Sequence, residues 1–396
     1  MKKGWEIKKL GDLGKVSMCK RIMKNQTTPT GDIPFYKIGT FGKTPNAFIA
    51  DEVYEEYKSK YSFPKKGDIL LSASGTIGRR VVYDGNPAYF QDSNIVWIDN
   101  NEEIVLNEYL FQFYGFCNWN PSKGSTISRL YNDDLRRITI PFPKSLEEQK
   151  KIVAILDKTF EKIEIAKKNV EKNLQNAKEL FQSELNRIFS QKGKGWVEKQ
   201  LGAVTVIITK GSSPKWQGVE YITSPGVLFV TSENVGEGKI LLNKRKYVEE
   251  RFNQIETKSI LKKGDVLTNI VGASIGRTAV YNINDIANIN QAVCAIRCRP
   301  QELYNYYLTY LLNSPYLKNI LHDNEVNNAR ANLSLTFFRN LIVLLPPLEK
   351  QKEIVERLDS LSSDIKQLEA QYSKKLVDLE ELKKSILQKA FEGELV

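Results

Sequence analysis

Two long stretches of the chain carry apolar residues at heptad spacing on a charged background. The first runs from Pro143 to about Gln191, and the second runs from Pro347 to about Glu392. Two apolar rows offset by three or four positions are typical of a coiled-coil helix, and proline is favoured at the first position of a helix. The pattern therefore predicts two helices of roughly 45 residues, each about 65 Å long. We interpret both helices as spacers.

The residues at these heptad positions are predicted to form the apolar seam of the two helices. They are Leu156, Phe160, Ile163, Val170, Leu174, Leu358, Leu361, Ile365, Leu368 and Tyr372. Lys167 and Lys375 interrupt the rows, and we expect both lysines to help set the register. Because two helices of matched length occur in one chain, we expect the seam to be satisfied within the molecule.

Outside these helices, short apolar runs alternate with Gly and Asp turns. Strands are predicted at residues 33–38, 69–72, 80–83, 94–98, 135–141 and 227–230, and helices at 106–118 and 303–312. A basic, polar loop is expected at residues 122–126. Short β runs separated by such turns favour an α+β fold whose globular parts are β-rich and mainly antiparallel.

Three landmarks of the first half of the chain return in the second half in the same order. They are Gly4-Trp5 with Gly195-Trp196, Lys66-Gly67-Asp68 with Lys263-Gly264-Asp265, and Gln149 with Gln351. The chain therefore reads as two copies of one unit of about 195 residues. We expect globular domains at residues 1–145 and 194–346, and helical spacers at 146–193 and 347–396.

The net charge of +11 is concentrated in the globular domains. Residues 1–145 carry 21 Lys or Arg against 16 Asp or Glu, and residues 194–347 carry 18 against 12. The helical stretches 146–191 and 348–396 carry 9 against 8 and 9 against 11. A basic globular surface favours partners that bear phosphate, although a mildly basic surface that serves solubility alone remains an alternative.

One motif in each basic domain could approach a phosphate backbone closely. Ser72 to Arg80 is matched by Asn269 to Arg277, and each copy has paired glycines, a small hydroxyl residue and an arginine. Such a loop can present backbone N–H groups and a guanidinium to phosphate. A tight turn with an ordinary surface arginine is the alternative, and recurrence in both domains favours the functional interpretation.

The candidate contacts with phosphate or base edges extend beyond these loops. In the first unit they are Lys37, Ser74, Gly75, Thr76, Arg79, Arg80, Gln91, Asn94, Lys123 and Arg129. In the second unit they are Thr231, Gly272, Ser274, Arg277, Gln291 and Arg330. Amide side chains can pair with adenine edges in a major groove, but they also cap strand ends, and each basic residue could be a solvated surface charge.

The sequence offers no set of residues for catalysis, a metal or a cofactor. It has no Gly-x-x-x-x-Gly-Lys-Ser/Thr loop, and His322 is the only histidine. Cys19, Cys117, Cys294 and Cys298 are interpreted as buried thiols. No apolar run reaches the roughly 20 residues that cross a bilayer, and the N-terminus lacks the apolar core of a signal peptide. We therefore expect a non-catalytic, cytoplasmic protein.

The order and duplication of these motifs resemble the DNA specificity subunit of type I restriction-modification systems. The resemblance rests on the Gly-Trp openings, Lys-Gly-Asp-Ile/Val-Leu, the Ile-Gly-Arg loops, Leu345 to Val355 and Ile386 to Leu395. It implies two target-recognition domains, each reading one half of a split site in double-stranded DNA. It also implies that the two helices pack as an antiparallel coiled coil, which separates the domains and docks two methyltransferase subunits and the restriction and translocation subunits.

The two copies differ within the motifs, which is expected if the domains read different sequences. Arg79-Arg80 corresponds to Arg277-Thr278, and Lys37 corresponds to Thr231. No base-reading residue is therefore assigned by transfer from the family. A coiled-coil scaffold whose globular ends bind proteins is the alternative from another functional class, and the salt dependence of DNA binding would distinguish the two.

Overall fold

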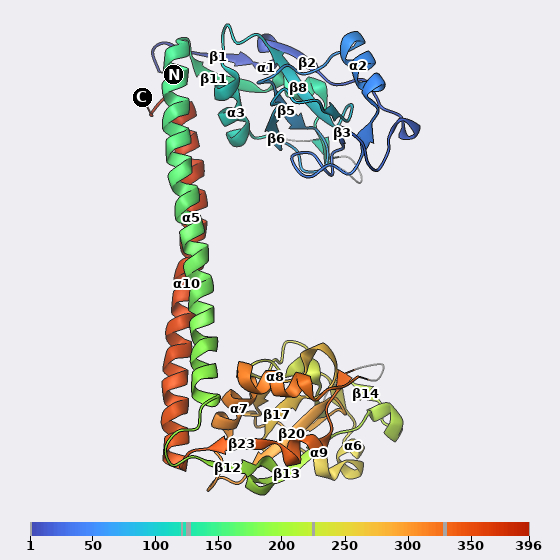
Figure 1. The fold of residues 1–396 in the computed structure, drawn as a ribbon, viewed down its shortest axis with the longest axis vertical. Coiled ribbons are helices and arrows are strands. Elements are labelled where there is room, and N and C mark those ends of the chain that lie inside the picture. The colour runs from blue at the N-terminus through green and yellow to red at the C-terminus, as the bar shows by residue number, and fades with distance from the viewer. Residues whose placement is uncertain (1, 120–121, 124–127, 224–225, 328–330, 396) are drawn as a thin grey trace. The chain divides into compact units, whose positions relative to one another are not determined.

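The computed structural model describes the chain except residues 1, 120–121, 124–127, 224–225, 328–330 and 396. Two compact units are present, Met1–Val170 with Ser373–Val396, and Glu171–Tyr372. Each unit combines a globular α+β part with a segment of each of two long helices, α5 (Leu146–Phe189) and α10 (Leu348–Glu392) (Figure 1).

The first unit is built on two small sheets. One is antiparallel, with the order β2 (Gly14–Ser17), β8 (Ile95–Asn100), β5 (Ile69–Ser72) and β6 (Arg80–Val82). The other has the order β4 (Phe48–Ile49), β3 (Ile33–Tyr36) and β7 (Tyr89–Phe90). The remaining elements are the pairs β1 (Trp5–Lys9) with β11 (Thr139–Pro143) and β9 (Ser122–Lys123) with β10 (Ser128–Arg129), and α1 (Leu10–Leu13), α2 (Asp51–Lys60), α3 (Asn107–Phe116) and α4 (Asn132–Arg137).

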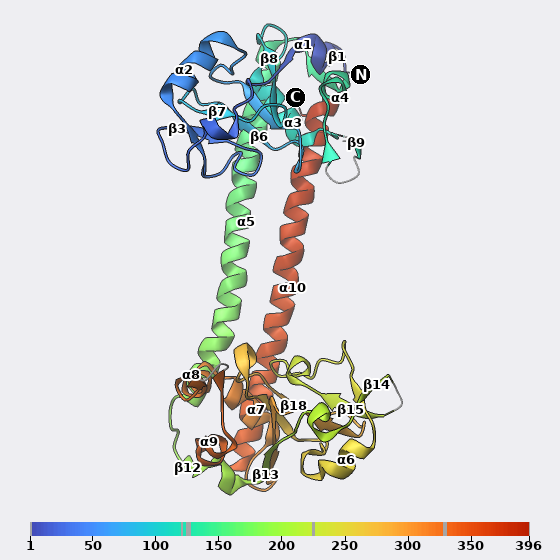
Figure 2. The same ribbon diagram turned by 90° about the vertical axis from the view of Figure 1, so that its right-hand side faces the viewer.

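The second unit repeats this plan. Its antiparallel sheet has the order β13 (Thr205–Lys210), β20 (Val293–Cys298), β17 (Val266–Asn269) and β18 (Thr278–Val280). Its other sheet has the order β14 (Tyr221–Ile222), β16 (Tyr247–Val248), β15 (Val227–Val230) and β19 (Ala287–Ile289) (Figure 2). The remaining elements are β12 (Val197–Gln200) with β23 (Ile342–Leu345), β21 (Val326–Asn327) with β22 (Ala331–Asn332), α6 (Arg251–Ile255), α7 (Asn305–Asn313), α8 (Pro315–Asp323) and α9 (Leu335–Asn340).

The matching strand orders confirm the predicted duplication and the α+β fold with mainly antiparallel sheets. Two pairs are exceptions, because β3 pairs with β7 and β15 pairs with β19 in parallel. The strand predicted at residues 135–141 was wrong in its first part, which belongs to α4. Pro143 ends β11 instead of starting a helix, and α5 begins three residues later.

A fully buried glutamine holds each long helix to the globular part of its unit. Gln149 accepts a hydrogen bond from the Leu106 N–H at 2.9 Å, and its own amide donates to two backbone carbonyl groups. Gln351 makes the equivalent three bonds in the second unit. The Leu106 N–H and the Ile104 carbonyl lie just before α3, and the Pro143 carbonyl lies just before α5. Gln149 therefore links the start of α5 to the start of α3, and Gln351 links α10 to α7 in the same way.

Within each unit, α5 and α10 pair side by side (Figure 1, Figure 2). In the first unit Lys167 pairs with Glu380 and Glu164 pairs with Lys383, so residue numbers rise on one helix as they fall on the other. In the second unit Arg357 contacts Glu184 at 2.8 Å. The pairing in the first unit is therefore antiparallel, as the family resemblance implies.

The predicted seam residues differ in burial. Leu156, Ile163, Val170, Leu358 and Ile365 are buried, and Phe160, Leu174, Leu361 and Tyr372 are half-buried. Leu368 is 37% exposed, contrary to the prediction. Lys375 is also exposed. The buried row of α10 follows Leu358 and Ile365, whereas the neighbouring heptad row through Leu361 and Leu368 is only partly covered.

Candidate nucleic-acid interface

In the first unit, the glycine loop between β5 and β6 is held by its own hydrogen bonds. The Ser72 hydroxyl donates to the Thr76 carbonyl at 2.6 Å and accepts from the Arg79 N–H at 2.8 Å. Gly75 and Gly78 have φ values of 67° and 80°, a region that L side chains rarely adopt. The loop is consequently rigid and leaves Gly75 and Thr76 exposed.

The matching loop of the second unit is held by a buried amide. Asn269 takes the place of Ser72, and its Nδ2 donates to the Ser232 carbonyl at 2.9 Å and to the Ser274 hydroxyl at 3.2 Å. Gly272 has a φ value of 74°, and Arg277 is exposed. Each loop thus begins at a buried polar side chain and turns at a glycine with a positive φ value, but the second loop is one residue longer and includes a short 3₁₀ helix, Gly272–Ser274.

Each glycine loop lies beside a short hairpin. Ser74 forms an antiparallel bridge with Arg129 of β10, and Val271 forms the matching bridge with Asn332 of β22. In the first unit the Ser74 hydroxyl lies 2.7 Å from Oδ1 of Asn94, and Nη2 of Arg129 donates to the Ser93 carbonyl at 3.4 Å. The structure therefore brings Ser74, Asn94 and Arg129 together at the edge of the sheet where β5 ends and β8 begins.

Three further candidates of the first unit meet at a neighbouring turn. Oε1 of Gln91 accepts from the Ile38 N–H at 2.9 Å, and Nη1 of Arg79 donates to the Phe41 carbonyl at 2.9 Å. Lys37 is exposed in this turn. Gln91 and Arg79 thus shape the turn that presents Lys37.

Arg80, which is predicted to contact phosphate, is half-buried and packs against an aromatic ring of its own unit. Its guanidinium packs 4.4 Å from the centre of the Phe111 ring, and burial lowers its pKa. Gly115 makes room for it, because a Cβ there would lie 2.2 Å from Nη1 of Arg80. The corresponding Thr278 is also buried, and its hydroxyl donates to Thr268 at 2.8 Å.

The remaining candidates of the second unit are less gathered. Thr231 is buried, and its backbone N–H and its hydroxyl donate to Oδ1 of Asn234 at 2.9 and 3.1 Å. Gln291 is half-buried beside the start of β20. Arg330 and the side chain of Lys123 lie outside the described residues.

Sequence reasoning missed the buried amides that support these loops, Asn234 and Asn269. Nδ2 of Asn234 donates to the carbonyls of Leu241 and Lys244 at 2.9 and 3.1 Å. An isolated asparagine carries no periodic signal, so hydropathy predicts it at the surface. The alignment of Asn269 with Ser72 was the one signal that could have identified it.

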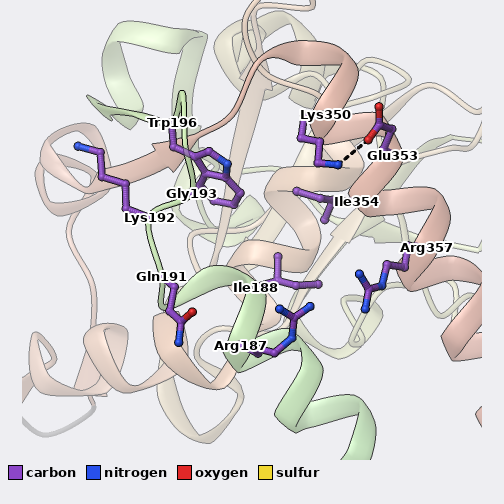
Figure 3. Close-up of a pocket in the computed structure, with 10 residues that line it drawn as sticks. All are labelled: Arg187, Ile188, Gln191, Lys192, Gly193, Trp196, Lys350, Glu353, Ile354 and Arg357. Atoms are coloured by element: carbon purple, nitrogen blue, oxygen red, sulfur yellow. Dashed lines mark hydrogen bonds and ion pairs between the residues drawn. The ribbon is translucent and has the colours of Figure 1, made fainter.

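A cavity of about 380 Å³ lies in the second unit, where α5 ends and α10 begins (Figure 3). It is lined by Arg187, Ile188, Gln191, Lys192, Gly193, Trp196, Lys350, Glu353, Ile354 and Arg357. Glu184 pairs with both Arg187 and Arg357, and Lys350 pairs with Glu353. The hydrogen bond from Arg187 holds the pKa of Glu184 below its usual value. The charges of this cavity are thus largely balanced by ion pairs.

The described residues offer neither a metal site nor a membrane-spanning helix. No group of three or more His, Cys, Asp or Glu side chains there could hold a metal ion. None of the helices in the described part of the chain is long and apolar enough to span a membrane.

Comparison with known proteins gives consistent similarities. The model of the type I restriction modification DNA specificity domain matches residues 2–176 and 193–377. S.HindORF215P of Haemophilus influenzae is 63% identical over 153 residues, which are 39% of this chain and 40% of that protein. The type I restriction enzyme EcoBI specificity subunit of Escherichia coli is 31% identical over 170 residues, which are 43% of this chain and 36% of that protein. The chain thus spans about two fifths of the length of these relatives.

The fold is also found in a solved structure. A chain in a structure of the type I R-M system superposes with a TM-score of 0.74 at 20% sequence identity. The match covers 100% of this chain and 99% of the other. At this identity the similarity establishes the shared fold.

Proposed function

Because this chain belongs to the type I restriction-modification DNA specificity domain family, we propose that it is a specificity subunit that recognises a bipartite target in double-stranded DNA. The observation that carries the proposal is the repeated edge of each globular part, where a glycine loop lies beside a hairpin. Rigid loops with exposed backbone can follow a phosphate backbone closely.

The charge distribution supports the same proposal. The excess of lysine and arginine lies in residues 1–145 and 194–347, whereas the helical stretches are close to neutral. Lys37 and Arg277 are exposed near the glycine loops. Neutralised phosphates release counterions, so such a surface gains affinity for any duplex, and the polar side chains at the same edge supply base contacts.

We propose that residues 1–145 and 194–346 act as two target-recognition domains and that 146–193 and 347–396 act as spacers. The helices of 44 and 45 residues rise about 65 Å, which corresponds to roughly two turns of duplex DNA. Each domain would read one half-site, and the helices would set the gap between the half-sites.

We further propose that the chain itself is non-catalytic and acts with partner subunits. Two methyltransferase subunits and the restriction and translocation subunits would perform the chemistry on the DNA that this chain selects. The sequence supports this view, because it lacks a nucleotide-hydrolysis loop and has a single histidine.

Methylation-site sequencing of the host, with and without this gene, would first identify the target. Fluorescence anisotropy would then follow binding of the full chain, with its copurifying methyltransferase, to a 40-base-pair duplex that carries the target. We expect the dissociation constant to rise steeply between about 50 and 200 mM salt. A salt-independent dissociation constant, or capture of other proteins without DNA binding, would support the scaffold alternative and overturn the proposal.

A further inference from the structure

The most exposed large apolar side chain in the described part of the protein is Trp216, with 77% of its surface in solvent. It lies on a short 3₁₀ helix, Pro214–Gln217, in the loop that follows β13. A single exposed apolar residue is common on protein surfaces and by itself indicates nothing. The surroundings of Trp216 and a matching site in the first unit provide the argument.

Two lysines precede Trp216 closely in the sequence. Lys210 ends β13, Lys215 precedes the tryptophan, and both are exposed. Neither forms an ion pair with any residue that the structure describes. The loop therefore carries an exposed apolar side chain close in sequence to two positive charges, a combination suited to a surface that is apolar and bears phosphate.

The loop of Trp216 begins at the edge of the sheet that carries the candidate interface. Lys210 is opposite Cys294 in the sheet, just after Gln291. Gly211 packs so closely against the end of β19 that a Cβ at this position would lie 1.7 Å from the Ile289 carbonyl oxygen. In the same sheet Asn269, at the start of the glycine loop, is opposite Val293. The loop and the candidate contacts thus share one edge.

The first unit has the same feature at the corresponding position. The loop after β2 leads to a short 3₁₀ helix, Lys24–Gln26, and Met23 directly before it is 57% exposed. Lys20 and Lys24 on either side are exposed. Arg21 pairs with Asp92 at 2.9 Å, which holds this loop beside Gln91. An exposed apolar side chain with two exposed lysines close in sequence therefore occurs in both units.

We propose that Trp216, with Met23 as its counterpart in the first unit, packs against the bases of the duplex at the margin of each half-site. Apolar side chains wedge between base steps from the minor groove, and aromatic rings stack on bases. The lysines close in sequence to each apolar residue neutralise the adjacent phosphates. The inference rests on the proposed function and adds a contact outside the glycine loops.

The test compares the unmodified chain with Trp216→Ala and Trp216→Phe, each with its copurifying methyltransferase and the 40-base-pair target duplex. Trp216→Ala is expected to raise the dissociation constant about tenfold, and Trp216→Phe to retain most of the affinity. Ile286→Ala is the matched control. Ile286 is 69% exposed, and it lies before β19, away from the edge that follows Ile289.

Acrylamide quenching provides a second measurement on the unmodified chain. Trp5 and Trp97 are buried and Trp119 and Trp196 are half-buried, so Trp216 dominates the accessible fluorescence. DNA binding should protect this fluorescence from quenching in the unmodified chain. In the Trp216→Ala variant, DNA binding should change the quenching little.

Each of the remaining outcomes overturns either the inference or the proposed function. Unchanged affinity and unchanged quenching with DNA bound would overturn the inference and leave the proposed function standing. Unchanged DNA affinity with loss of a copurifying subunit would show that Trp216 contacts protein, which also overturns it. Failure of the unmodified chain to bind the duplex would overturn the proposed function itself.

Discussion

Gln149 and Gln351 show how much a single buried polar side chain decides in this protein. Each lies at the start of a long helix, is fully buried and satisfies three backbone groups. A buried polar group that loses its hydrogen-bond partner still carries the full free-energy cost of its removal from water. The two glutamines therefore contribute more to the placement of the helices than the many charged pairs on the helix surfaces, which are exposed to solvent.

Substitution of Gln149 by alanine should destabilise the first unit by about 1–3 kcal/mol, because the Leu106 N–H and two carbonyl groups lose their partner. Urea denaturation followed by circular dichroism would measure the change. Gln175→Ala on the exposed surface of α5 is the control, with an expected change below about 0.5 kcal/mol. Equal effects of the two substitutions would contradict the role given to Gln149.

Arg277 is exposed, and we propose that its guanidinium contacts phosphate, so Arg277→Ala should weaken binding to specific and unrelated duplexes alike. The slope of log affinity against log salt should fall by about one. Anisotropy titrations at several salt concentrations would measure this slope. As the control, Lys374→Ala on α10 also removes one positive charge, at a position distant from Arg277 in the sequence. A similar loss of DNA affinity in that variant would mean that only the net charge of the protein matters.

At the scale of elements, the long helices were predictable because heptad repeats are a signal carried by many residues. The strand at residues 135–141 was not, because the short α4 and the start of β11 share one apolar-basic run too brief to show a period. The glycine loops could be found through their repetition. The burial of Arg80 could not, because it depends on Phe111 and Gly115, which are distant in sequence.

The two apolar rows of α10 should differ in their contribution to stability. Ile365 is 6% exposed and Leu368 is 37% exposed. Ile365→Ala should cost about 2–4 kcal/mol of unfolding free energy, whereas Leu368→Ala should cost less than about 1 kcal/mol. Thermal and urea unfolding of the two variants would compare them, and a larger loss for Leu368→Ala would place the seam on the other row.

At the scale of the whole molecule, the proposed function depends on the helices as spacers. Insertion of four residues after Lys172 lengthens α5 by about one turn, or roughly 6 Å. We expect the gap between the two half-sites to change, as read by methylation-site sequencing in a host that carries the variant. Four residues added after Val396 serve as the control and should leave the gap unaltered. A gap that is the same in both variants would contradict the spacer proposal.

The strand order repeated in the two units has an evolutionary consequence. In each unit a strand pair, β1 with β11 or β12 with β23, leads into a long helix, and an equivalent glutamine binds that helix to the globular part. A gene segment exchanged between these boundaries would encode a globular part whose strand pair and backbone groups already fit the long helices. Under the proposed function, new half-site preferences could therefore be acquired by recombination of whole globular parts, without changes in the residues that attach them to the helices.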